Sequence, residues 1–148
     1  MSLHTYTKCW LHIIWGTLNR DKLLATKDSR KKASTFLYEY AKSKNIYMIN
    51  NYVNSDHVHA LINLSSDMSI ESALHLLKGA SSRLINSDKL ISTKFSWGRG
   101  YGAFSVSEST LQKTIEYIEK QEEHHRAKSF IEEYQSFIKL YGLKYIDE

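Results

Sequence analysis

The order in which strand-like and helix-like segments alternate constrains this chain more than any other feature of its sequence. Four segments that are rich in β-branched and aromatic residues or alternate in hydrophobicity predict strands, at residues 6–17, 46–53, 57–64 and 101–106. Apolar residues recur at helical spacing in each of the two long connections between them. This order matches the split βαβ arrangement of ferredoxin-like folds. We therefore expect an α+β fold in which two helices cover one face of a four-stranded antiparallel sheet, with the first and third strands at its centre.

Short polar side chains mark where helices are expected to begin. Asp67 or Ser69 is placed to cap the second helix, and Ser107 or Ser109 to cap a third. Ser129 begins a capping-box pattern, which predicts a fourth helix near the end of the chain. Additional C-terminal helices therefore follow the predicted sheet.

The composition bounds the class of protein. A chain of 148 residues with 42% hydrophobic and 24% charged residues is expected to form one domain, with a ferredoxin-like core at 1–106 and C-terminal helices at 107–148. No apolar run approaches the ~20 residues of a membrane span, and the N-terminus lacks the pattern of a signal peptide. A single cysteine, Cys9, cannot form an internal disulfide. These features predict a cytoplasmic protein.

The positive charge of the chain is compatible with a nucleic-acid partner. The formal net charge is +4 and the isoelectric point is near 9.0, values that suit a polyanion but equally describe solvated surface lysines. Candidate DNA contacts are Lys78, Arg83, Arg99, Arg20 and His12. For the lysine and the arginines a purely solvated role stays open, and His12 either contacts DNA or tunes the histidines beside it.

His57 and His59 are candidate metal ligands on the third strand. Because alternate residues of a strand point to one face, both imidazoles are expected on the sheet face that the two helices leave open. Two imidazoles so placed could share a cation. A structural, hydrogen-bonded role for either histidine remains the alternative.

Tyr117 and Gln121 are expected on one side of the third helix because they are four residues apart. A phenol with an ordinary pKa of about 10 is a poor nucleophile near neutral pH, so it needs a base or an electrophile activated by a metal. Two imidazoles and an amide oxygen are neutral ligands that leave a divalent ion its full charge, which favours Mg²⁺ or Mn²⁺ acting on a phosphodiester. Zinc stays open if His124 or His125 joins the ligands.

Taken together, these motifs resemble the small bacterial insertion-sequence transposases of the HUH superfamily that use a single tyrosine. This family includes domesticated relatives associated with repetitive extragenic palindromes. The stretches that carry the resemblance are residues 10–15, 56–62, 77–82 and 97–106, the last continuing to 117–125. The ordered set spans nearly the whole chain.

The resemblance implies a metal-dependent nuclease and strand transferase that acts on single-stranded DNA, often beside a folded hairpin. It places His57, His59 and Gln121 as ligands of Mg²⁺ or Mn²⁺ and Tyr117 as the nucleophile. Attack would leave a 5′-phosphotyrosine bond and a free 3′-hydroxyl. Family members are dimers in which the tyrosine can serve the partner's histidines, so a homodimer is expected, with Tyr117 acting in cis or in trans.

Two hypotheses from other functional classes compete with the transposase hypothesis. The first is a non-catalytic ferredoxin-like module that binds single-stranded nucleic acid. The aromatic residues on central strands that such a module would use are only partly present, as Trp10. The 97–101 stretch could stack a flipped base, although Trp97 is expected to pack against the C-terminal helices instead. The second is a structural or hydrolytic zinc domain that uses His57, His59 and His125.

Overall fold

The sheet has the topology that the sequence predicts. The computed structural model describes residues 5–122 and 128–144. Its strands are β1 (Trp10–Gly16), β2 (Tyr47–Val53), β3 (His57–Asn63) and β4 (Gly102–Val106). They form one four-stranded antiparallel sheet in the order β2-β3-β1-β4, so the first and third strands are central. The predicted α+β, ferredoxin-like fold is confirmed.

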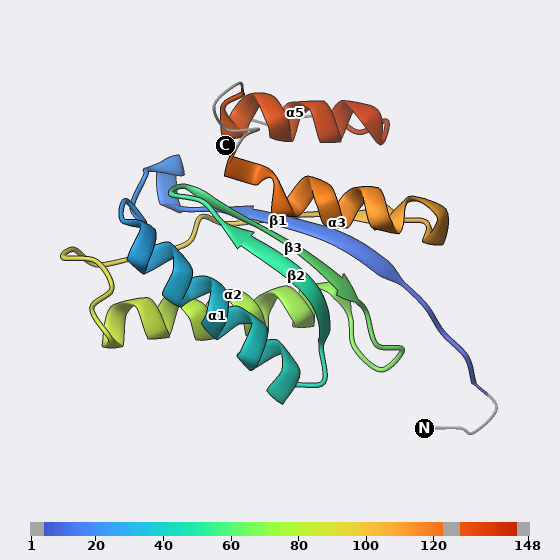
Figure 1. Cartoon of the computed structure of the whole chain (residues 1–148), viewed down its shortest axis with the longest axis horizontal. Coiled ribbons are helices and arrows are strands. Elements are labelled where there is room, and N and C mark those ends of the chain that lie inside the picture. The colour runs from blue at the N-terminus through green and yellow to red at the C-terminus, as the bar shows by residue number, and fades with distance from the viewer. Residues whose placement is uncertain (1–4, 123–127, 145–148) are drawn as a thin grey trace.

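Helices cover both faces of this sheet. The α-helices are α1 (Lys27–Ser43), α2 (Ile70–Ser87), α3 (Leu111–Glu119) and α5 (Phe130–Leu140), and the short 3-10 helices are η1 (Leu18–Arg20) and η2 (Glu108–Thr110). Helices α1 and α2 lie on one face, whereas α3 and α5 lie on the other (Figure 1). The sheet is therefore the middle of three layers. No helix in the described ranges has both the length and the hydrophobicity that crossing a membrane requires.

Alternation along β1 divides its side chains between the two faces. Ile13 and Trp15 are buried in the large core beneath α1 and α2. Ile14 points to the opposite face, where it packs with Phe104 of β4 and Phe130 of α5. The second, smaller core therefore fixes α5 to the half of the sheet formed by β1 and β4.

Helix capping agrees with the sequence at two of the three predicted positions. The hydroxyl oxygens of Ser69 and Ser129 accept backbone N–H bonds at the starts of α2 and α5. Neither Ser107 nor Ser109 caps α3, because the Ser107 hydroxyl instead contacts the hydroxyls of Ser109 and Thr110, at 3.1 and 2.9 Å. The 3-10 turn η2 intervenes, and α3 begins only at Leu111.

Trp97 is partly buried and packs against the large core rather than against the C-terminal helices, which corrects the expectation from sequence. A backbone bridge joins Trp97 to Thr17 at the end of β1. The indole consequently meets Trp15 edge-on, with ring centroids 5.7 Å apart, and its Nε1 donates to Ser81 Oγ of α2 at 3.0 Å. The Trp97 side chain therefore has a packing role.

Candidate active site

The two histidines of β3 lie on the sheet face covered by α3 and α5. Both side chains are fully buried, and their ring centroids lie 5.0 Å apart. His12, on the neighbouring strand β1, is also buried, and its Nε2 lies 2.7 Å from Nδ1 of His59. The predicted common face of His57 and His59 is confirmed, and His12 is placed as the hydrogen-bond neighbour of His59.

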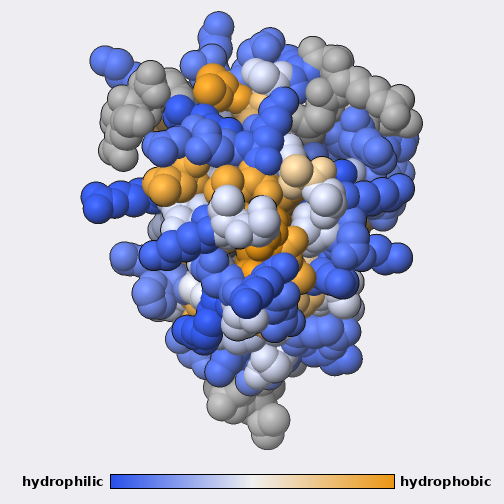
Figure 2. Space-filling model, turned by 90° about the vertical axis from the view of Figure 1, so that its left-hand side faces the viewer, coloured by the Kyte–Doolittle hydropathy of each residue, from blue (hydrophilic) through white to orange (hydrophobic). Residues whose placement is uncertain are grey.

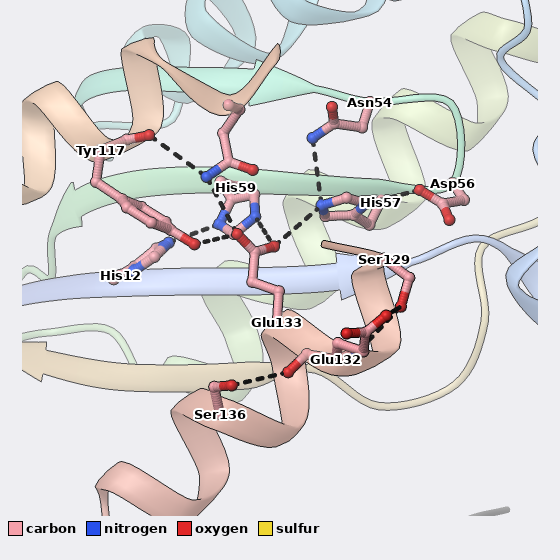
Figure 3. Close-up of polar contacts among 11 residues, drawn as sticks. His12, Asn54, Asp56, His57, His59, Tyr117, Ser129, Glu132, Glu133 and Ser136 are labelled. Carbon is pink, nitrogen blue, oxygen red and sulfur yellow. Dashed lines mark hydrogen bonds and ion pairs between the residues drawn. The ribbon is translucent and has the colours of Figure 1, made fainter. Parts of the chain in front are cut away.

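A buried carboxylate of α5 joins the two rings. Oε1 of Glu133 lies 2.9 Å from Nε2 of His59 and 3.5 Å from Nε2 of His57 (Figure 3). The other ring nitrogen of His57, Nδ1, lies 2.7 Å from Oδ1 of Asp56. Nδ1 of each histidine is therefore held by a neighbour, Asp56 or His12, and Nε2 is directed to Glu133, with Nδ2 of Asn54 also 3.2 Å from Nε2 of His57.

Sequence reasoning missed Glu133. The signal that could have found it is its position on α5, because it follows Phe130 by three residues and precedes Phe137 by four. A carboxylate on the apolar side of an amphipathic helix needs a buried partner. The capping box fixed where the helix begins but not which surface its apolar side covers.

Tyr117 reaches the same carboxylate from α3. Its hydroxyl donates a hydrogen bond to Oε2 of Glu133. Its ring centroid lies 6.0 Å from that of His59 and 6.1 Å from that of His12. The structure thus brings the predicted nucleophile and the predicted metal ligands of one chain into a single buried cluster.

Gln121 lies beside this cluster but not on an uninterrupted helix with Tyr117. Helix α3 ends at Glu119, and Gln121 follows that end. Its side chain is fully buried, and its Nε2 lies 3.3 Å from Oε2 of Glu133 and 3.4 Å from the carbonyl oxygen of Tyr117. The predicted role of Gln121 as a metal ligand stays a prediction.

Burial and charge set the protonation of these groups. Burial raises the pKa of Tyr117 above its ordinary value, and the hydrogen bond and charge of Glu133 raise it further. Burial lowers the pKa of His12 well below its ordinary value. Burial also disfavours protonated His57, but hydrogen bonds to Asp56 and Glu133 outweigh it and raise the pKa of His57. Tyr117 is therefore a neutral phenol and His12 a neutral imidazole near pH 7.

The lysine and the arginines among the candidate DNA contacts lie in three different settings. Nζ of Lys78 donates to the carbonyl oxygens of Gly98 and Gly100, at 2.9 Å each, and burial lowers its pKa. Arg20 and Arg99 line a cavity next to the histidines. Arg83 is exposed on α2, across the sheet from the cluster. His124 and His125, the additional ligands considered for zinc, lie outside the described residues.

Helix α5 approaches the sheet where two strands carry glycine. A Cβ atom on Gly16 of β1 would lie 2.8 Å from Cε2 of Phe130. A Cβ on Gly102 of β4 would lie 2.8 Å from Cε1 of Tyr134. Because glycine has no side chain, Phe130 and Tyr134 can occupy the space above these two positions. The glycines therefore let α5 lie close to the sheet, which helps to set the distance between Glu133 and the histidines.

Solved structures of transposases share this fold. A crystal structure of a candidate transposase from Deinococcus radiodurans R1 superposes with a TM-score of 0.64 and 25% sequence identity, covering 82% of this chain and 96% of the other. A REP-associated tyrosine transposase bound to a REP hairpin superposes with a TM-score of 0.59 and 14% identity, covering 84% of this chain and 74% of the other. The second likeness is one of fold alone.

Sequence comparison agrees with the structural neighbours. The chain is 27% identical over 124 residues to the transposases for insertion sequence element IS200 of Salmonella typhimurium and Salmonella typhi, covering 80% of this chain and of each relative. The family model described as "Transposase IS200 like" matches residues 5–121, which include both histidines of β3, Tyr117 and Gln121 but not Glu133. This chain belongs to the IS200-like transposase family, a family of DNA-cleaving enzymes.

Proposed function

We propose that this transposase cleaves and rejoins single-stranded DNA through a covalent bond between Tyr117 and a 5′-phosphate. The observation that carries the proposal is the convergence of Tyr117, His57 and His59 on Glu133 within one buried cluster. A phenol, two imidazoles and a carboxylate provide a nucleophile, a proton acceptor and metal ligands. Membership of the transposase family supplies DNA as the substrate class.

Tyr117 Oη is the nucleophile in this mechanism. Its attack forms a P–Oη bond and breaks the bond between phosphorus and the 3′ oxygen, which takes up a proton and leaves as a 3′-hydroxyl. Oε2 of Glu133 already accepts the hydrogen bond of the phenol, so it is placed to take the Tyr117 proton. This acceptor matters because the pKa of Tyr117 is raised. In the reverse step a 3′-hydroxyl attacks the phosphotyrosine and restores Tyr117, so the phosphodiester is remade without an external energy source.

The buried cluster could hold a metal ion. His57, His59 and Glu133 each offer one ligand atom, and these atoms all lie within 4.8 Å of one another. We assign Mg²⁺ or Mn²⁺ to this site, with the two imidazoles favouring Mn²⁺. When bound, such an ion supplies positive charge that polarises the phosphodiester and stabilises the leaving oxygen.

Two neighbours are suited to orient the ligand rings. Asp56 accepts a hydrogen bond from Nδ1 of His57, and the neutral His12 is suited to accept one from Nδ1 of His59. If these bonds hold the Nδ1 protons, each Nε2, the nitrogen that faces Glu133, would be left to bind an ion in place of its contact with the carboxylate. Asp56 and His12 are therefore positioning residues for the proposed ligands.

The substrate that we propose is single-stranded DNA with a hairpin next to the cleavage site. The support is the hairpin bound by a structural neighbour of this chain. The DNA that flanks the coding region is the first place to search for such a hairpin, because insertion sequences carry their own ends.

The test of this function is a covalent adduct. Single-stranded oligonucleotides with the flanking hairpins, incubated with the chain and Mn²⁺ or Mg²⁺, are expected to give a protein–DNA band that survives SDS. Tyr117→Phe should abolish that band because the phenylalanine ring has no oxygen to bond to phosphorus. Gel electrophoresis of labelled DNA measures the result.

Tyr38→Phe is the matched control, since Tyr38 is exposed on α1, on the opposite face of the sheet. This variant should form the adduct at the wild-type level. A band that persists in Tyr117→Phe would refute the assignment of the nucleophile, and loss of the band in both variants would show a folding defect.

A further inference from the structure

A cavity of about 410 Å³ opens next to the candidate active site. Its walls are residues 15–20 at the end of β1 and in η1, residues 98–101 before β4, and Phe130 and Tyr134 of α5. The Phe130 ring separates the cavity from the cluster, since it also stacks on His57, with centroids 4.1 Å apart and planes 4° apart. The cavity and the histidine pair therefore share one wall.

Hydrogen bonds hold two walls of this cavity together. The N–H of Gly98 donates to the carbonyl of Gly16 at 2.8 Å, and the N–H of Leu18 donates to the carbonyl of Ser96 at 3.0 Å. Lys78 fastens the same loop from α2 by donating to the carbonyls of Gly98 and Gly100. The cavity is thus formed before any ligand arrives, which lowers the entropic cost of binding.

The lining suits a nucleotide. Among the described residues that line the cavity, Arg20 and Arg99 are cationic and none is acidic. Tyr101 is 38% exposed and offers an aromatic face, and base stacking on such faces does not depend on sequence. Figure 2 faces the side on which β1 ends, and shows hydrophobic surface in the middle surrounded by hydrophilic side chains.

Backbone conformation adds a second observation at the same wall. Asn19 and Arg20 have φ angles of 56° and 58°, in the left-handed region that is unfavourable for residues other than glycine. Such conformations persist where surrounding structure enforces them, and they are concentrated at functional sites. In η1 these two backbone conformations place Arg20 at the wall of the cavity.

The position of the cavity fixes which nucleotide it faces. Tyr117 lies beside His59 and His12, whereas His57 lies on the other side of Glu133 (Figure 3). The cavity lies beyond His57, because Phe130, which stacks on His57, also lines the cavity. In phosphoryl transfer the attacking and leaving oxygens are roughly in line on opposite sides of phosphorus. A phosphate at the cluster that is attacked by Tyr117 therefore directs its leaving 3′ oxygen toward the cavity.

We propose that this cavity binds the nucleotide that carries the leaving 3′ oxygen, with its base against Tyr101 and its phosphate near Arg20 and Arg99. The choice of the nucleotide on this side of the break rests on the proposed function. The proposal that the cavity binds a nucleotide of single-stranded DNA does not depend on it. After cleavage the same contacts hold the strand with the free 3′-hydroxyl close to the phosphotyrosine, ready for rejoining.

The first experiment measures binding without cleavage. A fluorescein-labelled oligothymidylate of about ten nucleotides is titrated with the full-length Tyr117→Phe chain, without added metal, and anisotropy is recorded. Tyr101→Ala in this background should weaken binding roughly tenfold or more. Arg99→Gln should weaken binding and reduce the slope of log affinity against log salt by about one.

Lys31→Gln, at an exposed position of α1 on the far face, is the control for loss of one charge. Circular dichroism and thermal unfolding should show that all variants fold. The cavity assignment is overturned if Arg99→Gln and Lys31→Gln have equal effects and Tyr101→Ala binds like its parent.

The second experiment assigns the side of the break on an oligonucleotide that forms the Tyr117 adduct. An abasic site is placed either at the nucleotide that keeps the 3′-hydroxyl or at the nucleotide joined to Tyr117. Only the first substitution should weaken binding, and Tyr101→Ala should remove that difference. A larger loss from the second would overturn the assignment of the nucleotide, whereas failure of every oligonucleotide to form an adduct would count against the proposed function, with the first experiment still deciding the cavity.

Discussion

At the scale of single residues, the two carboxylate oxygens of Glu133 face different partners. Oε1 faces His57 and His59, and Oε2 accepts the hydrogen bond of Tyr117. A carboxylate that is only 4% exposed is stable only when its charge is matched by donors or by a cation. Replacement of Glu133 should therefore affect both the binding of the metal ion and the Tyr117 phenol.

Glu133→Gln tests this dependence, because an amide keeps the size of the side chain but lacks its charge. The affinity of the chain for Mn²⁺, measured by isothermal titration calorimetry without DNA, should fall by about tenfold or more. Glu132→Gln is the control, since Glu132 is the exposed neighbour on the same turn. Equal affinities of the two variants would remove Glu133 from the ligands.

At the scale of elements, α5 is the structure on which the site depends most. It supplies Glu133 and Phe130, and its first turn is fixed by Ser129, whose Oγ accepts the N–H of Glu132 at 3.2 Å. The same helix is anchored at its other end by Tyr141, whose hydroxyl donates to the carbonyl of Ser105 at 2.8 Å. The Tyr141 bond holds the helix to β4, and the Ser129 cap stabilises the first turn of the helix itself. A change in the cap should therefore lower the stability of the fold.

Ser129→Ala should lower the free energy of unfolding by about 1 kcal/mol, because an N–H at the start of α5 loses its acceptor. Ser136→Ala on the same helix is the control, since Ser136 is exposed and its hydroxyl bonds to a carbonyl within the helix. Its effect should stay within about 0.5 kcal/mol. Urea unfolding followed by circular dichroism measures both. A loss that is the same for both variants would show that the cap contributes nothing specific.

Local patterns predict the elements, whereas docking between distant elements does not follow from them. Alternation along β3 was sufficient to place His57 and His59 on one face, because the direction of a strand side chain is a local property. The spacing of Glu133 from Phe130 and Phe137 indicates a buried carboxylate. Which residues it meets depends on how α5 packs on β1 and β4, and no spacing within residues 129–142 reveals that. The turn at η2 was also missed, since bonds among three hydroxyls compete with a helix cap.

At the scale of the whole molecule, the cluster is assembled from elements of one chain. Tyr117 of α3 and Glu133 of α5 meet the histidines of β3 without a second copy. This arrangement favours action of Tyr117 in cis, whichever oligomer forms. The homodimer, and the division of the chain at residue 106, stay predictions.

Mixing two inactive variants distinguishes the two arrangements. Tyr117→Phe keeps the histidines and His59→Ala keeps the tyrosine, so a mixed dimer regains one complete site only if Tyr117 acts in trans. We expect no adduct from the mixture after co-refolding or co-expression, because each cis site still lacks one group. Recovery of adduct in the mixture would show that the tyrosine serves its partner. Size-exclusion chromatography with light scattering should accompany the assay, since mixed dimers must form for the result to count.

The glycines under α5 have a consequence for how substitutions at this surface would be interpreted. A methyl group at Gly16 or Gly102 would collide first with Phe130, Phe104 or Tyr134, side chains that pack between strand and helix, rather than with the strands that pair beside it. In a mutational scan that scores abundance and transposition separately, substitutions at these two positions would therefore lower the transposition score but not the abundance score. Chains with alanine there would remain abundant while losing activity, a pattern ordinarily attributed to residues that touch the substrate.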